Sequence, residues 1–175
     1  MFKRRLASTA VLALAFPLPS GAEVVDAAAS GFTTRHSITI SRSRAEVYRA
    51  SVGKIGSWWS DDHTVSGHAA NMYLEARPLG CFCEKLGEDG AVVHMTVTFV
   101  NPTVMLRLNG GLGPLGLMGV NGNMTWEFAD GEEGTTLTWS YAVGGYFPAG
   151  LEKVAGAVDA VLIEQMTRLA GFLEE

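Results

Sequence analysis

The C-terminal end of the chain decides the fold: residues 134–172 read GTTLTWSYAVGGYFPAGLEKVAGAVDAVLIEQMTRLAGF. Apolar and polar side chains alternate along residues 134–146, which is typical of a strand with one buried face. After Pro148, apolar residues and Gln165 recur at the spacing of one helix face. The apolar ones are Leu151, Ala155, Val158, Leu162, Leu169 and Phe172. We expect a last strand that leads into one long C-terminal helix.

A series of further strand patterns precedes this pair. MYLEA, GCFCEKL, AVVHMTVTFV, TVMLRL and GNMTWEFA follow one another between residues 72 and 129. The turn signals between them are short, which favours hairpins and an antiparallel sheet. Upstream, RHSITI at 35–40 predicts a first strand, and Ser43 with Glu46 forms a capping box that begins a short helix. A second short helical turn follows, and residues 60–71 predict a loop.

Length and composition are typical of one compact domain. The 175 residues are 47% hydrophobic and carry a net charge of −5. An acidic chain without a cluster of Lys and Arg beyond its N-terminus is not expected to bind nucleic acid.

The first residues predict an export signal. MFKRR supplies a basic start, and LASTAVLALAFPL supplies an apolar run too short to span a bilayer. Small residues favour cleavage after Ala22, with a second possible site after Ala29. The alternatives are a buried N-terminal helix or an uncleaved membrane anchor. We expect a periplasmic or secreted protein without stable membrane insertion, in which residues 23–33 form a flexible lead-in to a domain at 34–174.

The two cysteines, Cys81 and Cys83, are separated by one residue in a predicted strand. In a regular strand, residues two apart have Cα atoms about 6.5–7 Å from each other, and their side chains are too far apart for a disulfide. We therefore expect two free thiols on one face of the strand.

The segment GLGPLG at 111–116 has the spacing of a dinucleotide-binding loop. Such a loop needs a helix directly after it, whereas LMGVNGNMTW contains two glycines and continues into a strand pattern. We expect a connection between two strands that binds no nucleotide. Its apolar residues are expected to cap the core, line a cavity mouth or form a lid.

The order of elements resembles the START and polyketide-cyclase-like superfamily, also called SRPBCC, over about residues 34–174. The resemblance rests on SRAEVYRASVGKIGSWWS after the first strand, on LEARPLGCFCEKLGEDG, and on GTTLTWSYAVGGY before the long helix. Leu79 and Cys81 depart from it, because the family often has Gly and Arg there.

This resemblance implies an α+β helix-grip fold, in which a curved seven-stranded antiparallel sheet wraps around the long helix and encloses a cavity. It leaves the function open, because relatives bind lipids, sterols or plant hormones, cyclise polyketides, or activate a heat-shock ATPase.

Several aromatic and apolar residues are candidates for the wall of such a cavity, although plain core packing is an alternative for most of them. The small residues in the first half of the long helix favour a void beside them. The candidate ligand-binding residues are Trp58, Trp59, Phe82, Glu84, Leu115, Leu117, Met118, Trp126, Trp139, Tyr141 and Gln165.

Glu84 is the candidate that carries a charge. By strand parity it shares a face with Phe82 and Leu86, and the family pattern implies that this face points inward. There its pKa should rise or it should find a hydrogen-bond donor. The alternative is a solvated glutamate at a strand end. Gln165 is likewise either a boundary residue or a polar group of the cavity.

The histidines give no catalytic or metal-binding pattern. His63 and His68, with Asp61 and Asp62, are expected to be solvated loop residues. His94 alternates with polar residues and is expected to be exposed. We expect no metal and no cofactor.

The favoured function is noncatalytic binding or carriage of a small apolar or amphipathic molecule. The alternative is a cavity enzyme of the cyclase, dehydratase or hydrolase type, with Glu84 as acid or base beside His36 or Tyr141. Paired inward titratable groups would favour the enzyme. A third possibility is protein–protein contact through Trp58, Trp59 and the glycine segment.

Overall fold

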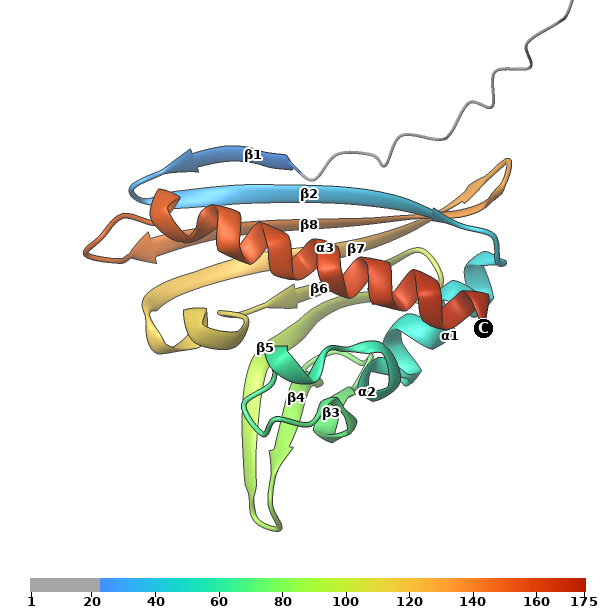
Figure 1. The fold of residues 1–175 in the computed structure, drawn as a ribbon, viewed down its shortest axis with the longest axis horizontal. Coiled ribbons are helices and arrows are strands. Elements are labelled where there is room, and N and C mark those ends of the chain that lie inside the picture. Colours follow the sequence, from blue (N-terminus) through green and yellow to red (C-terminus); the bar gives the residue numbers. More distant parts are fainter. Residues whose placement is uncertain (1–22) are drawn as a thin grey trace, which may run out of the picture.

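The computed structural model describes residues 23–175. The predicted export signal and its cleavage site after Ala22 lie outside the described residues. The protein has an α+β fold in which a curved antiparallel sheet is covered by a long C-terminal helix, as the sequence predicts (Figure 1).

Eight strands form the sheet, in the order β1-β2-β8-β7-β6-β5-β4-β3. The strands are β1 (Glu23–Ala28), β2 (Gly31–Ile40), β3 (Met72–Leu74), β4 (Cys81–Leu86), β5 (Gly90–Asn101), β6 (Met105–Asn109), β7 (Gly119–Gly131) and β8 (Gly134–Tyr146). The expected sheet has seven strands. The additional one is β1, which pairs antiparallel with β2 in the segment expected to be a flexible lead-in.

Three α-helices and three 3₁₀ turns complete the described chain. They are α1 (Arg44–Gly53), α2 (Ile55–Trp58), η1 (Asp61–His63), η2 (Ala69–Asn71), η3 (Gly113–Leu117) and α3 (Glu152–Glu174). The predicted capping box begins α1: the Ser43 hydroxyl accepts from the Glu46 amide, and the Glu46 carboxylate accepts from the Ser43 amide.

The helix α3 lies across β2, β8 and β7, while the β4–β5 hairpin extends away from them at a steep angle (Figure 1). The side chains of β8 that alternation assigns to the inner face are all buried: Leu137, Trp139, Tyr141 and Val143. Helix and curved sheet thus share one core, as expected for a sheet with a single apolar face.

Two indoles form the centre of this core. Trp139 on β8 is paired with Trp126 on β7, and their rings stack with centroids 4.6 Å apart. Both side chains are buried, and within residues 23–175 neither indole nitrogen has a hydrogen-bond partner. Both rings are part of the packed core and do not line the cavity described below.

Candidate functional site

A cavity of about 600 Å³ lies between α3, the glycine segment and the loop that follows α2. The helix contributes five residues to its wall: Val154, Ala157, Val158, Val161 and Leu162. The glycine segment contributes residues 111–118. The opposite side consists of Trp59, Asp62, His63, Thr64, Val65, Met72, Val92, Val93 and His94. The volume lies within the range of small-molecule sites, and the wall is mainly apolar, as in such sites.

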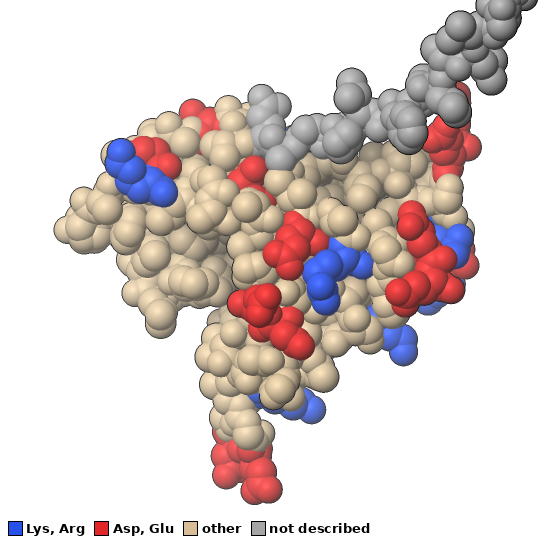
Figure 2. Space-filling view, viewed as in Figure 1, with Lys and Arg blue, Asp and Glu red and all other residues tan. Residues whose placement is uncertain are grey.

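The rim formed by the glycine segment carries no charge. Between Arg107 and Glu127 the sequence contains no Asp, Glu, Lys or Arg. Figure 2 shows the consequence: charged side chains gather over α3 and at the tip of the β4–β5 hairpin, whereas the surface over η3 is uncharged. Leu117, on this rim, is 93% exposed.

The glycine segment is a tight turn between two strands, as predicted. It forms η3 and continues directly into β7, so no α-helix follows it. A Cβ atom at Gly111 would lie 2.8 Å from the backbone of Leu115, and one at Gly122 would lie 2.6 Å from the Tyr141 ring. Glycine is therefore needed for close packing of the turn and its neighbours.

Tyr141 fixes this turn to the sheet. Its hydroxyl donates to the Gly110 carbonyl over 2.9 Å and accepts from the Leu112 amide over 3.1 Å. Burial raises the pKa of Tyr141 to about 12, although the hydrogen bond from Leu112 acts in the opposite direction. The neutral hydroxyl can thus donate and accept at the same time.

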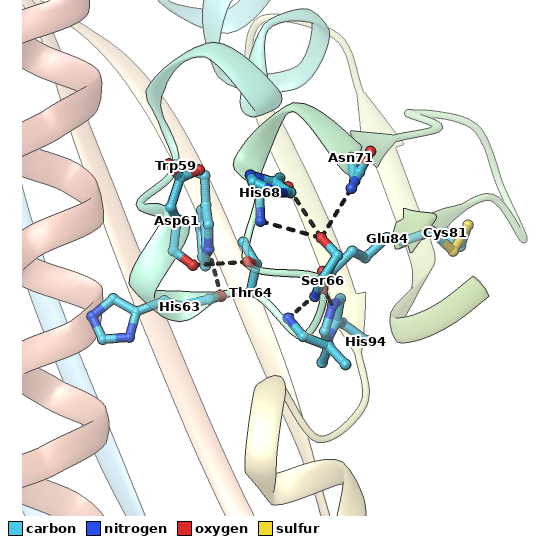
Figure 3. A network of polar contacts seen from close by, with 12 residues as sticks. Trp59, Asp61, His63, Thr64, Ser66, His68, Asn71, Cys81, Glu84 and His94 are labelled. Carbon is cyan, nitrogen blue, oxygen red and sulfur yellow. Dashed lines mark hydrogen bonds and ion pairs between the residues drawn. A yellow bond between two sulfur atoms is a disulfide. The ribbon is translucent and has the colours of Figure 1, made fainter. Parts of the chain in front are cut away.

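Glu84 is the centre of a polar network behind the cavity wall (Figure 3). Its carboxylate accepts from the backbone amides of Val65, at 3.0 Å, and Ser66, and from His94 Nε2 at 3.0 Å. The side chain is fully buried. Burial opposes ionisation, but the hydrogen bonds from Ser66, Val65 and His94 outweigh it and lower the pKa of Glu84. Glu84 is buried instead of solvated and has found donors, although its side chain does not line the cavity.

The prediction that His94 is exposed is wrong, because strand β5 is not regular at this position. Phe82 is paired with Met95 and Cys83 with Val93, so His94 is an extra residue of β5 opposite β4. Such a β-bulge shifts the alternation of side chains by one. His94 and Met95 are consequently both buried, and His94 faces Glu84 and the cavity.

The prediction of two free thiols is also wrong. Cys81 and Cys83 form a disulfide, and their Cα atoms lie 5.4 Å apart (Figure 3). Only in a regular strand would the two cysteines be too far apart for a bridge, and the register shift at Phe82 and Cys83 lies within this segment. The shorter Cα separation is within the range of disulfides.

The loop after α2, residues 60–71, is held at several points. Gln165 on α3 is fully buried, and its Oε1 atom accepts from the Ser60 amide over 2.8 Å. His63 lies 3.0 Å from Glu164 of the same helix, and this hydrogen bond lowers the pKa of Glu164. Asp61 accepts from the Ala69 amide over 2.6 Å. Together with the hydrogen bonds of Glu84, these contacts hold the loop in position, where it forms one wall of the cavity.

Four of the candidate ligand-binding residues line the cavity: Trp59, Leu115, Leu117 and Met118. The others do not line it. Trp58, Phe82, Trp126, Trp139 and Tyr141 are buried in the core, Glu84 is behind His94, and Gln165 holds the loop.

The three candidate catalytic residues do not form one group. His36 Nε2 lies 2.8 Å from Asp159 Oδ1 on α3, in a contact that is close but outside hydrogen-bond geometry. Tyr141 binds the glycine turn, and Glu84 binds the loop. The titratable residues that do line the cavity are Asp62, His63 and His94.

Sequence reasoning missed His94, Val92 and Val93 as wall residues. The alternation of AVVHMTVTFV assigns His94 to the outer face, and no turn residue or glycine within that run marks the bulge. Within residues 23–175, no three His, Cys, Asp or Glu side chains are grouped so as to hold a metal ion. In the same part of the chain, no helix has the length and hydropathy needed to cross a membrane.

No family model matches the sequence, and no curated protein matches it. Solved structures share the fold. An uncharacterized protein from Rhizobium leguminosarum has a TM-score of 0.62 at 16% identity, over 82% of this chain and 95% of that chain. Protein SSP2350 from Staphylococcus saprophyticus has a TM-score of 0.59 at 15% identity, over 82% of this chain and 92% of that chain. DynU16, from the dynemicin biosynthetic locus, has a TM-score of 0.56 at 19% identity, over 81% of this chain and 47% of that chain. At these identities the likeness shows the fold alone.

Proposed function

We propose that this chain binds a small apolar or amphipathic molecule in the cavity beside α3, as a protein of the START and polyketide-cyclase-like superfamily. The observation that carries the proposal is the cavity of about 600 Å³, walled mainly by aliphatic side chains and bordered by a charge-free segment. Its volume is large enough for a molecule of drug-like size.

The disulfide supports the proposed periplasmic or extracellular location. Disulfides persist in oxidising compartments and are rare in the cytosol. Cys81 and Cys83 are bridged, and the N-terminus carries an export pattern. A ligand carrier outside the cytoplasm agrees with both features.

The binding function is tested with an uncharged apolar probe, N-phenyl-1-naphthylamine, and a variant that fills the cavity. Ala157 lines the cavity, so Ala157→Trp should lower the affinity for the probe at least tenfold. Ala160 is exposed on the same helix and does not line the cavity, so Ala160→Trp is the matched control. Equal affinities of both variants and the wild type would contradict the proposal.

A thermal melt provides a second measurement. A ligand at 100 times its Kd stabilises the folded state by about 2.7 kcal/mol. We expect the probe to raise the melting temperature, and NAD, FAD and ATP to leave it unchanged, because η3 continues into β7 and offers no α-helix N-terminus to a phosphate. Stabilisation by a nucleotide but not by the apolar probe would refute the assignment.

One observation favours the cavity enzyme as a second candidate. Glu84 and His94 are buried, titratable and 3.0 Å apart, and His94 is on the cavity wall. In such an enzyme, His94 would exchange protons with the substrate. Glu84 would orient the ring of His94 instead of acting as the acid or base itself. A reaction that His94→Gln and Glu84→Gln both abolish would favour the enzyme.

A further inference from the structure

The polar side chains at the mouth of the cavity are already engaged or solvated. Asp62 is exposed, and the Thr64 hydroxyl donates to the Asp61 carbonyl over 2.8 Å. His63 lies 3.0 Å from Glu164. None of these side chains needs a ligand to complete its hydrogen bonds.

His94 differs from them because it is buried and because one of its ring nitrogens has no hydrogen-bond partner. The residue is 5% exposed, yet it belongs to the cavity wall. Its Nε2 atom faces Glu84 at 3.0 Å, and its Nδ1 atom makes no hydrogen bond to any residue in 23–175. Of the polar side chains of the wall, His94 is therefore the one that combines a mostly buried ring with an unused hydrogen-bonding atom.

The partner at Nε2 determines what Nδ1 can do. An ionised carboxylate only accepts hydrogen bonds, so Nε2 must carry a hydrogen. Nδ1 then presents a lone pair when the ring is neutral and a hydrogen when the ring is protonated. A weakly acidic hydroxyl fits both forms: it donates to the neutral ring, and its anion accepts from the protonated ring. An ether or an alkane lacks the hydrogen that the neutral ring would accept.

We propose that His94 is the polar anchor of the cavity, and that the ligand is an apolar molecule with one weakly acidic hydroxyl, such as a phenol or a carboxylic acid. This inference rests on the proposed binding function and specifies the ligand class for the same site. The apolar body of the molecule would lie against Val158 and Leu115, and the hydroxyl would lie at Nδ1.

Two probes with the same ring system test the inference. 2-Naphthol carries the hydroxyl, and 2-methoxynaphthalene replaces its hydrogen by a methyl group. We expect wild-type protein to bind 2-naphthol at least tenfold more tightly than the ether. His94→Phe should remove this preference and still bind both compounds, because Phe keeps an apolar ring in the wall. Ala157→Trp should weaken the binding of both compounds.

A measurement on the wild type keeps the test valid if His94→Phe does not fold. The ¹⁵N chemical shift of His94 Nδ1 should change on addition of 2-naphthol and stay constant with 2-methoxynaphthalene. If both compounds bind equally and leave the Nδ1 shift unchanged, the role of His94 is refuted while the binding function stands. If neither compound nor the apolar probe binds, the proposed function itself fails.

Discussion

At the scale of single side chains, Glu84 links three segments, because its carboxylate joins β4 to the loop after α2 and to β5. Glu84→Gln keeps the shape of the side chain and removes its charge. The amide group cannot accept at both of its ends, so some of the three donors lose their partner. We expect a loss of about 1–3 kcal/mol in the free energy of unfolding near pH 7, measured by urea denaturation.

The loss in the free energy of unfolding caused by Glu84→Gln should decrease at low pH. The hydrogen bonds lower the pKa of Glu84 in the folded state below the value of about 4.3 in the unfolded chain. The charge of Glu84 therefore stabilises the fold fully above the unfolded pKa, and this contribution decreases as the pH falls through the folded pKa. The stability difference between wild type and Glu84→Gln should therefore shrink as the pH falls below about 4.

Glu88→Gln serves as the control, because this exposed carboxylate at the β4–β5 turn has no partner to lose among the described residues. Its free energy of unfolding should stay within about 0.5 kcal/mol of the wild type. A difference between wild type and Glu84→Gln that stays undiminished below about pH 4 would contradict the role assigned to the carboxylate.

Tyr141 has a comparable role for the glycine segment. Tyr141→Phe removes one donor and one acceptor and leaves the Leu112 amide and the Gly110 carbonyl without that partner. We expect a destabilisation of about 1–3 kcal/mol, together with faster hydrogen exchange at the Leu112 amide.

Tyr48→Phe is the matched control, since the Tyr48 hydroxyl makes no hydrogen bond within residues 23–175 and its ring packs against Phe128. An equal effect of both substitutions on exchange at Leu112 would show that the hydroxyl of Tyr141 does not hold the turn.

Among the elements, the β4–β5 hairpin contains two failed predictions, the exposed His94 and the free thiols, and both involve the register shift between its strands. Alternation predicts which face a residue occupies only while the register is unbroken. The bulge at His94 breaks it, which buries that histidine, and the adjoining segment of β4 contains the bridged cysteines. Neither feature is encoded in local periodicity, because a bulge results from the pairing of two strands.

The bridge between Cys81 and Cys83 is tested by alkylation of denatured protein prepared from an oxidising compartment. We expect no iodoacetamide adduct without reductant and two adducts after reduction, because both sulfur atoms are in the bridge. Two adducts without reductant would show that both thiols are free and that the bridge does not form.

For the molecule as a whole, the sequence predicts the order of elements better than the location of the site. The capping box at Ser43, the alternation of residues 134–146 and the helical stripe of α3 each depend on neighbours in the chain, and each is found in the structure. The cavity depends on how α3, η3 and the loop after α2 meet, so only part of its wall was predictable. Trp139 and Trp126 show the difference: their strands were predicted, but their rings fill the core instead of lining the cavity.

The apolar rim allows a test in which a substitution changes the affinity for the ligand but not the free energy of unfolding. Leu117 is 93% exposed and borders the cavity, so its replacement should change the free energy of unfolding by no more than about 0.5 kcal/mol. Leu117→Asp places a charge in a segment that has none, and a ligand that covers this position would have to desolvate the carboxylate. We expect the affinity for N-phenyl-1-naphthylamine to fall at least tenfold. Leu79→Asp is the control, because Leu79 is 82% exposed and outside the cavity wall. Unchanged affinity in Leu117→Asp would mean that the glycine segment does not cover the bound molecule, and the binding surface would then be restricted to α3 and the wall around His94.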